Sequence, residues 1–203
     1  MQPSNGRREW ATENDMQKLS TATELQQRLT HILDTVEREF RPLTAEQLRT
    51  KPANGGWSIV ECLQHLNLAE RYYVRQLQHK VAKLGLVQYN ADDQDIESDF
   101  VGRLALRFLD PKSTTKLPAP GMVKPRAASS LDSADVIQQF VALQALQKDL
   151  TGRLVYLDWN REKVPTMFGN WLKMRLGDVV RMLVLHTERH IGQAMRVKEG
   201  LSL

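Results

Sequence analysis

The chain has 203 residues, of which 41% are hydrophobic and 26% are charged. These values are typical of one globular domain, and they exclude a disulfide-stapled miniprotein and a wholly disordered chain. The formal net charge of +4 is small for this length and needs no nucleic acid or membrane to explain it.

The single cysteine, Cys62, cannot form an intramolecular disulfide, so a reducing compartment suits the chain best and we expect a cytoplasmic protein. The N-terminus lacks the apolar stretch of a signal peptide. No segment approaches the roughly 18 consecutive apolar residues that a membrane-spanning helix requires. The sequence therefore predicts neither secretion nor membrane insertion.

Residues 1–19 mix charges without periodicity and predict a flexible or peripherally docked N-terminal arm, followed by one helical domain over residues 20–203. The first helix is predicted at 22–41. Thr21 and Glu24 have the spacing of a capping box at its start. Apolar residues then recur on one face of the helix: Leu25, Leu29, Ile32, Val36 and Phe40.

The second helix is predicted at 58–84, after the segment 52–56, which is rich in residues that break helices. Ser58 and Glu61 form the clearest capping box of the chain. Glu61 could also act as a general base or hold a metal ligand in place, but capping is its expected role.

Residues 85–130 are predicted to cross outside the other helices, with helical spacing only at 100–109. The part from 101 to 130 contains Asp110 and six basic residues: Arg103, Arg107, Lys112, Lys116, Lys124 and Arg126. These charges could attract an anionic substrate, although simple solvation is the expected role. Because interleaved aromatic residues are missing, we expect no nucleic-acid partner.

Two further helices are predicted at 133–156 and 177–198. No window shows sustained strand alternation. Four long amphipathic helices with one long crossover connection predict an all-α four-helix bundle. In this architecture, metal and cofactor sites are built from side chains on facing helices.

Histidines are the candidate functional residues of this bundle. His186 and His190 lie about one helical turn apart on a single face, where both imidazoles can reach one ion. His65 lies two turns into the second helix, on the side expected to face the interior. Three imidazoles are the ligand set of open zinc-type sites, in which water or substrate takes the remaining position. His31 and His79 are expected on the surface.

Other residues near these histidines have alternative roles. Cys62 could be a fourth metal ligand, but an inert buried thiol is expected because Cys62 and His65 would compete for the same side of the ion. Gln193 could donate a hydrogen bond to a metal-bound ligand or satisfy a polar contact between helices. Trp57 and Trp171 are expected to be packing residues.

At these residues the sequence resembles the DinB-like (DinB/YfiT) superfamily of metal-binding four-helix bundles. The resemblance extends over about residues 22–199 and rests on two motifs: Gly56-Trp57-Ser58-x-x-Glu61-x-x-x-His65-Leu66 and His186-x-x-x-His190-x-x-Gln193. It implies a divalent metal ion, usually zinc or nickel, held by His65, His186 and His190. Family members of known activity include transferases and isomerases that act with low-molecular-weight thiols.

Two functions remain as hypotheses. The first is a thiol-dependent S-transferase or a related small-molecule transferase or hydrolase, with a low-molecular-weight thiol as co-substrate and Gln193 as a cofactor-binding residue. Three neutral histidines leave the charge of the ion unbalanced, which favours an anionic fourth ligand. The second is a non-catalytic, metal-stabilised bundle with an interaction or stress-response role.

The enzyme hypothesis predicts a small-molecule substrate and neither nucleic acid nor membrane as a partner, with a homodimer as the oligomeric form to test. Because imidazole must be neutral to bind a metal, binding is also expected to weaken below about pH 6.5.

Overall fold

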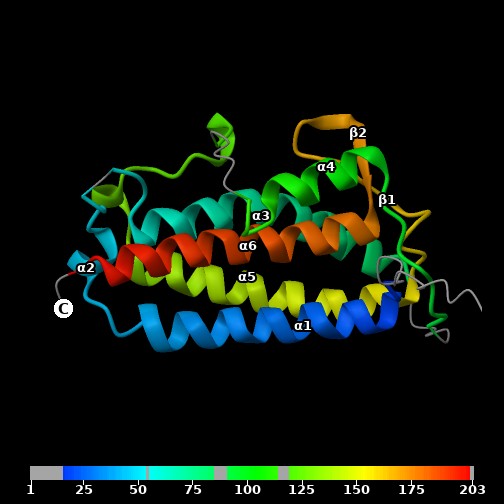
Figure 1. Cartoon of the computed structure of the whole chain (residues 1–203), viewed down its shortest axis with the longest axis horizontal. Coiled ribbons are helices and arrows are strands. Elements are labelled where there is room, and N and C mark those ends of the chain that lie inside the picture. Colours follow the sequence, from blue (N-terminus) through cyan, green and yellow to red (C-terminus); the bar gives the residue numbers. More distant parts are fainter. Residues whose placement is uncertain (1–15, 54, 85–90, 114–118, 202–203) are drawn as a thin grey trace, which may run out of the picture.

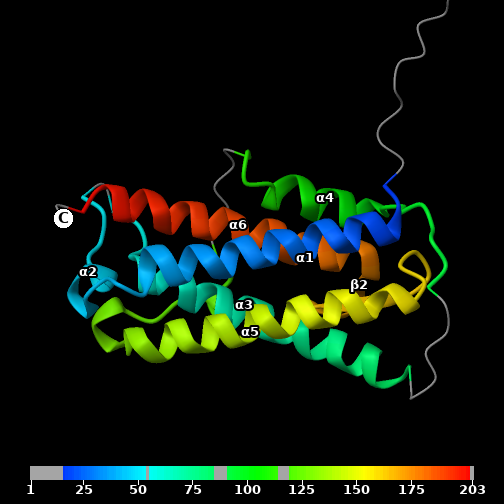
Figure 2. The ribbon, with the colours of Figure 1, turned by 90° about the horizontal axis from the view of Figure 1, so that it is seen from below.

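The computed structural model describes residues 16–53, 55–84, 91–113 and 119–201. The long helices of the chain lie side by side (Figures 1 and 2). They are α1 (Lys18–Thr35), α3 (Ile59–Ala82), α5 (Ser133–Arg153) and α6 (Leu176–Glu199). The helical bundle predicted from the sequence is therefore confirmed.

Each long helix has two neighbours in the bundle, because α5 and α6 both pack against α1 and α3. In Figure 1, α1 and α6 run in one direction and α3 and α5 run in the opposite direction. Since α3 and α5 are parallel, the chain between them must return along the bundle. This geometry explains the long connection between the second and third long helices.

Polar side chains fix where α3 and α5 begin. The Ser58 amide donates to Glu61 Oε2 over 2.8 Å, and the Ser58 side chain accepts from the Glu61 amide. Asp132 accepts from the amides of Ala134 and Asp135. Each such cap stabilises a helix by about 1 kcal/mol. Both helix starts agree with the sequence prediction.

The start of α1 differs from the prediction. The helix begins at Lys18 instead of residue 22, and Thr21 is a buried residue inside the helix instead of its cap. Backbone pairing with a distant segment fixes this end: the Lys18 amide donates to the Gln94 carbonyl over 2.9 Å, and the Ile96 amide donates to the Met16 carbonyl over 2.8 Å. No local sequence pattern reports such pairing.

Shorter elements complete the path of the chain. They are a π-helical turn at Val36–Phe40, the helix α2 (Ala45–Arg49), and 3₁₀ turns at Gly121–Val123, Ala128–Ser130 and Leu154–Tyr156. The predicted N-terminal arm falls mostly on residues 1–15, which lie outside the described residues, so this arm stays a prediction.

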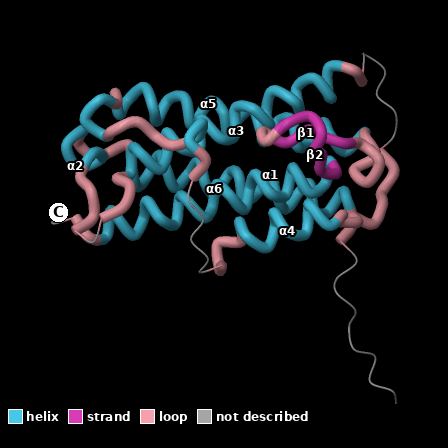
Figure 3. Tube along the Cα trace, turned by 90° about the horizontal axis from the view of Figure 1, so that it is seen from above, coloured by secondary structure: helices cyan, strands magenta, loops and turns pink. Residues whose placement is uncertain are grey.

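The helix α4 (Phe100–Leu109) is the helical part of the crossover, and it lies along α6 on the outside of the bundle (Figures 2 and 3). Asp99 caps its first turn by accepting a hydrogen bond of 2.9 Å from the Gly102 amide. Gly102 faces α6 so closely that a Cβ there would lie 1.9 Å from Asp178 Oδ2. Only glycine fits this contact.

Arg189 of α6 holds the other end of α4. Its Nη1 donates to the carbonyls of Asp110 and Ser113 over 3.0 Å and to the carbonyl of Phe108 over 3.4 Å. The Phe108 carbonyl belongs to the last turn of α4, where a helix leaves its carbonyl groups without internal partners, and Asp110 and Ser113 follow just beyond that turn. One side chain therefore joins the crossover to the helix that carries His186 and His190.

A hairpin of β1 (Lys163–Thr166) and β2 (Gly169–Arg175) precedes α6. No strand is predicted from the sequence, and this prediction is wrong. Val164 and Met174 pair across the hairpin and are buried, but Trp171 on β2 is 81% exposed. Because an aromatic residue lies on the exposed face, the sequence of these short strands does not alternate between apolar and polar residues. The expected packing role of Trp171 is also wrong, since its side chain is exposed.

One hydrophobic core fills the bundle and extends under the hairpin. Its fully buried members include Leu29, Leu63, Phe140 and Trp159, and side chains of this size contribute about 1.5–3 kcal/mol each by leaving water. In the described part of the chain, no helix has the length and apolarity needed to cross a bilayer.

Candidate metal centre

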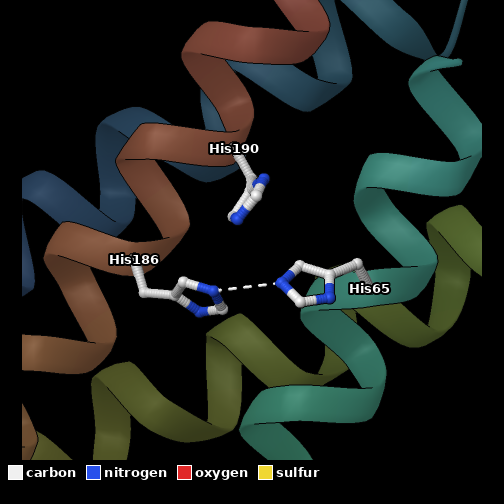
Figure 4. A group of neighbouring side chains, drawn as sticks. All are labelled: His65, His186 and His190. Atoms are coloured by element: carbon white, nitrogen blue, oxygen red, sulfur yellow. Dashed lines mark hydrogen bonds between the residues drawn. The ribbon is translucent and has the colours of Figure 1, made fainter. Parts of the chain in front are cut away.

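The three predicted histidines meet in the middle of the bundle. His65 projects from α3, and His186 and His190 project from neighbouring turns of α6 (Figure 4). Their candidate ligand nitrogens all lie within 4.8 Å of one another. His65 is buried, whereas His186 and His190 retain some exposed surface.

Each histidine has an oxygen atom at its Nδ1. His65 Nδ1 lies 2.8 Å from the Val123 carbonyl, and His190 Nδ1 lies 3.0 Å from Gln193 Oε1. Since both oxygens only accept, both Nδ1 atoms carry the proton, and each Nε2 keeps a lone pair. Such contacts fix the orientation of metal-binding histidines in proteins.

The Nε2 atoms of His65 and His186 face each other at 3.1 Å, as the dashed line in Figure 4 marks. Two imidazole nitrogens that bind one tetrahedral zinc ion at 2.0–2.1 Å are about 3.3 Å apart. The spacing and the chemistry of these donors therefore fit a divalent ion of this kind.

The surroundings of the cluster favour neutral imidazoles. Burial lowers the pKa of His65 to about 4, with a further contribution from the neighbouring His186. Burial lowers the pKa of His190 to about 2, with further contributions from His186 and His65. His65 and His190 therefore stay in the metal-binding form well below pH 6.5, the threshold expected from free histidine.

Trp57 covers the cluster on one side. Its ring centroid lies 4.8 Å from that of His65 and 5.7 Å from that of His190, and the His190 ring is nearly parallel to it at 30°. Trp57 is thus a packing residue, as expected, and the rings that it contacts are those of the site. It keeps water from this side of His65 and His190.

Sequence reasoning missed one residue of the site. Glu70 of α3 has no exposed surface, and its Oε1 lies 3.5 Å from His186 Nδ1. No carboxylate is predicted beside the three histidines from the sequence, but Glu70 lies beside His186 in the structure. The signal in the sequence is the spacing of Glu70, which follows Leu66 by four residues and therefore lies on the apolar face of the predicted helix.

The remaining candidate residues, Cys62, Glu61, His31 and His79, lie outside the group of possible metal ligands. Cys62 lies outside the group of possible ligands, and burial raises the pKa of its thiol to about 12, as expected for an inert thiol. Glu61 caps α3 and pairs with Lys51 at 3.1 Å. His31 and His79 are exposed, as predicted.

Comparison with known proteins agrees with the geometry. The sequence profile of the DinB superfamily matches residues 21–194, which include all three histidines. No curated protein and no solved structure matches the chain. Because the match extends over most of the sequence and the helical bundle is present, the chain belongs to the DinB superfamily.

Proposed function

We propose that the protein is a divalent-metal-dependent enzyme that binds one ion, zinc or nickel, through the Nε2 atoms of His65, His186 and His190. The observation that carries this proposal is the arrangement of the three rings. Their ligand nitrogens lie within 4.8 Å of one another, and each Nδ1 faces an oxygen atom that belongs to another residue.

The number of protein ligands favours catalysis over a structural role. Structural zinc sites have four protein ligands, whereas catalytic sites have three and keep a position for water or substrate. Among the described residues, the cluster contains three histidines and no cysteine. The non-catalytic bundle requires a fourth protein ligand, so the geometry favours the enzyme.

The reaction that we propose is the attack of a low-molecular-weight thiol, or of water, on an electrophilic small molecule. A divalent ion in this site would supply Lewis acidity, which lowers the pKa of a thiol or water into the physiological range. The chain itself holds the rings in place: the Val123 carbonyl fixes His65, and Gln193 fixes His190. Trp57 excludes water from one side.

Gln193 has a second proposed role as a cofactor-binding residue. Its Oε1 accepts from His190 Nδ1, which leaves the Nε2 amide group free to donate to a thiol or a substrate. Gln193→Met keeps the length of the side chain and removes the amide donor without adding a charge. Thiol binding is compared at saturating metal, so that the lost acceptor for His190 does not enter the comparison. If the donor holds the thiol, the loaded variant binds the thiol more weakly than the loaded native chain.

The test begins with elemental analysis of protein purified without a nickel column, which identifies the resident metal. Cobalt-substituted protein is then titrated with several low-molecular-weight thiols while its visible spectrum is recorded. We expect one ion per chain and a spectral change with at least one thiol. Four protein ligands and an unchanged spectrum would support the non-catalytic bundle instead.

A further inference from the structure

Glu70 is a buried carboxylate near the middle of α3, and it contacts both α5 and α6. Its Oε1 lies 2.7 Å from Thr187 Oγ1 and 3.5 Å from His186 Nδ1, and its Oε2 accepts a hydrogen bond of 2.6 Å from Gln144 Nε2. Glu70, Thr187 and Gln144 have no exposed surface, and the His186 side chain is 12% exposed. The carboxylate is therefore held by side chains of two other helices, α5 and α6.

Comparison with the other buried carboxylates shows what Glu70 lacks. The described part of the chain buries three: Glu61, Glu70 and Asp178. Glu61 lies 3.1 Å from Lys51, and Asp178 lies 3.7 Å from Arg181.

Glu70 differs, because among the described residues its one ion-pair partner is an imidazole, that of His186. A buried carboxylate without a positive partner is costly, and proteins avoid that cost by pairing it. Thr187 and Gln144 are neutral donors and supply no charge. A positive charge on the far side of the His186 ring would complete the arrangement.

We propose that Glu70 is a positioning residue that acts through His186 and balances the charge of the divalent ion, an inference that rests on the proposed function. The negative charge of the carboxylate, 3.5 Å from His186 Nδ1, favours the proton of that ring on Nδ1 and leaves its Nε2 to face His65 and His190. It also adds one negative charge beside three neutral ligands, so the loaded site carries one net positive charge instead of two. Carboxylates placed behind a metal-binding histidine raise the basicity of that ligand.

This charge has two consequences of opposite sign. A negative charge behind His186 strengthens the binding of a cation, but it weakens the binding of an anion beside that cation. Removal of the charge therefore weakens metal binding and strengthens anion binding to the loaded site. A merely structural role of Glu70 would change both affinities in the same direction, or neither.

The deciding variant is Glu70→Gln, which keeps the shape and the hydrogen-bond acceptor of the side chain and removes its charge. Glu188→Gln is the matched control. Glu188 lies on α6 between the two histidines of that helix, but its carboxylate binds Arg28 of α1 over 2.7 and 2.5 Å. The two variants remove the same charge, one facing the cluster and one facing away from it.

Cobalt binding and azide binding to the cobalt-loaded protein are measured for both variants. We expect Glu70→Gln to lower the affinity for cobalt about 10–100-fold and to raise the affinity of the loaded site for azide about threefold or more. Glu188→Gln should leave both affinities at the native value. Equal cobalt affinity in Glu70→Gln and the native chain, or weaker binding of both cobalt and azide, would overturn the inference.

These outcomes separate the inference from the proposed function, because native binding of cobalt upholds the histidine centre even where Glu70→Gln has no effect. A native chain that binds no divalent ion overturns both. If Glu70→Gln fails to fold, NMR of the imidazole nitrogens in the native, zinc-loaded protein decides. We expect His186 to carry its proton on Nδ1, and a proton on Nε2 would overturn the role of Glu70.

Discussion

Asp178 on α6 and Glu70 on α3 are both carboxylates without exposed surface, but their partners differ. Asp178 accepts a hydrogen bond of 2.5 Å from Ser98 Oγ and lies 3.7 Å from Arg181. Glu70 contacts neutral donors and His186. Protein groups alone complete the first arrangement, whereas in the second the carboxylate faces an imidazole of the candidate metal centre.

We call the first arrangement the anchor: Ser98, Asp99, Gly102, Asp178 and Arg181. We call the second the histidine centre: His65, His186, His190 and Glu70. The anchor fastens the crossover to the bundle, so changes there are expected to affect stability. The histidine centre offers nitrogen ligands, so changes there are expected to affect metal binding. Buried acids in one helical bundle thus serve different purposes, according to what faces them.

The largest expected effect separates the histidine centre from the other histidines. Alanine in place of His65, His186 or His190 should each abolish stoichiometric metal binding, because an ion with three protein ligands loses most of its affinity with one removed. His31→Ala and His79→Ala should leave binding intact, since both residues are exposed. Elemental analysis and calorimetric titration measure this. Metal retained by the triple alanine variant would end the hypothesis.

The next effect concerns the anchor. Gly102→Ala places a methyl group where Asp178 Oδ2 already lies, 1.9 Å from the new Cβ. We expect α4 to be displaced and the free energy of unfolding to fall by about 1–3 kcal/mol, as in other overpacked sites. Urea denaturation measures this, with Gly121→Ala as the control, since no atom lies within 4 Å of a Cβ there. A loss of metal affinity without a loss of stability would contradict the division into two regions.

A smaller effect depends on pH. Burial raises the pKa of Asp178 in the folded protein above its ordinary value of 3.8. Between these two values the folded state binds more protons than the unfolded state, so the free energy of unfolding falls as pH rises through this window. Asp178→Asn removes this dependence. Relative to the native chain, the variant should therefore become less destabilised as pH increases from about 3.8.

Denaturation of both proteins across this range measures the difference in slope. Asp149→Asn is the control for the loss of one carboxylate from the surface, because the Asp149 side chain is 62% exposed. Parallel curves for the native chain and Asp178→Asn would show that the buried carboxyl group titrates normally.

The smallest expected effect is at Cys62. Cys62→Ala should leave metal affinity unchanged, because the thiol lies outside the ligand group. In the native fold the thiol should also resist alkylation at neutral pH, since burial raises its pKa to about 12 and the residue has no exposed surface. Mass spectrometry after treatment with iodoacetamide tests this. Rapid labelling of metal-free protein alone would show that the thiol binds the ion.

Local patterns in the sequence were sufficient for part of the fold. The capping box of Ser58 and Glu61 acts within one turn, so its residues alone predict where α3 begins. The start of α1 depends on pairing with residues 94–96, far away in the sequence. The hairpin was missed because Trp171 stands exposed on a strand with few buried residues.

The candidate site divides in the same way. The spacing of His186 and His190 places them on one helical face. The apolar residues around His65 place it on the side of its helix that faces the interior, so the cluster of three histidines could be predicted. The role of Glu70 depends on Thr187 and Gln144, which arrive from two other helices. No spacing along α3 reports that contact, because it exists only after the bundle has assembled.

Two attachments to α6, at Gly102 and through Arg189, constrain the length of α4. On α6, Asp178 and Arg189 are eleven residues apart, about three turns of an α-helix, so they lie on nearly the same face. Asp178 contacts the start of α4 at Gly102, and Arg189 binds the Asp110 carbonyl at its end. One extra residue within α4 would turn its end by about 100° and advance it by about 1.5 Å, so both attachments could not form together. The length of α4 is thus matched to the spacing on α6, and insertions should be tolerated only outside this interval.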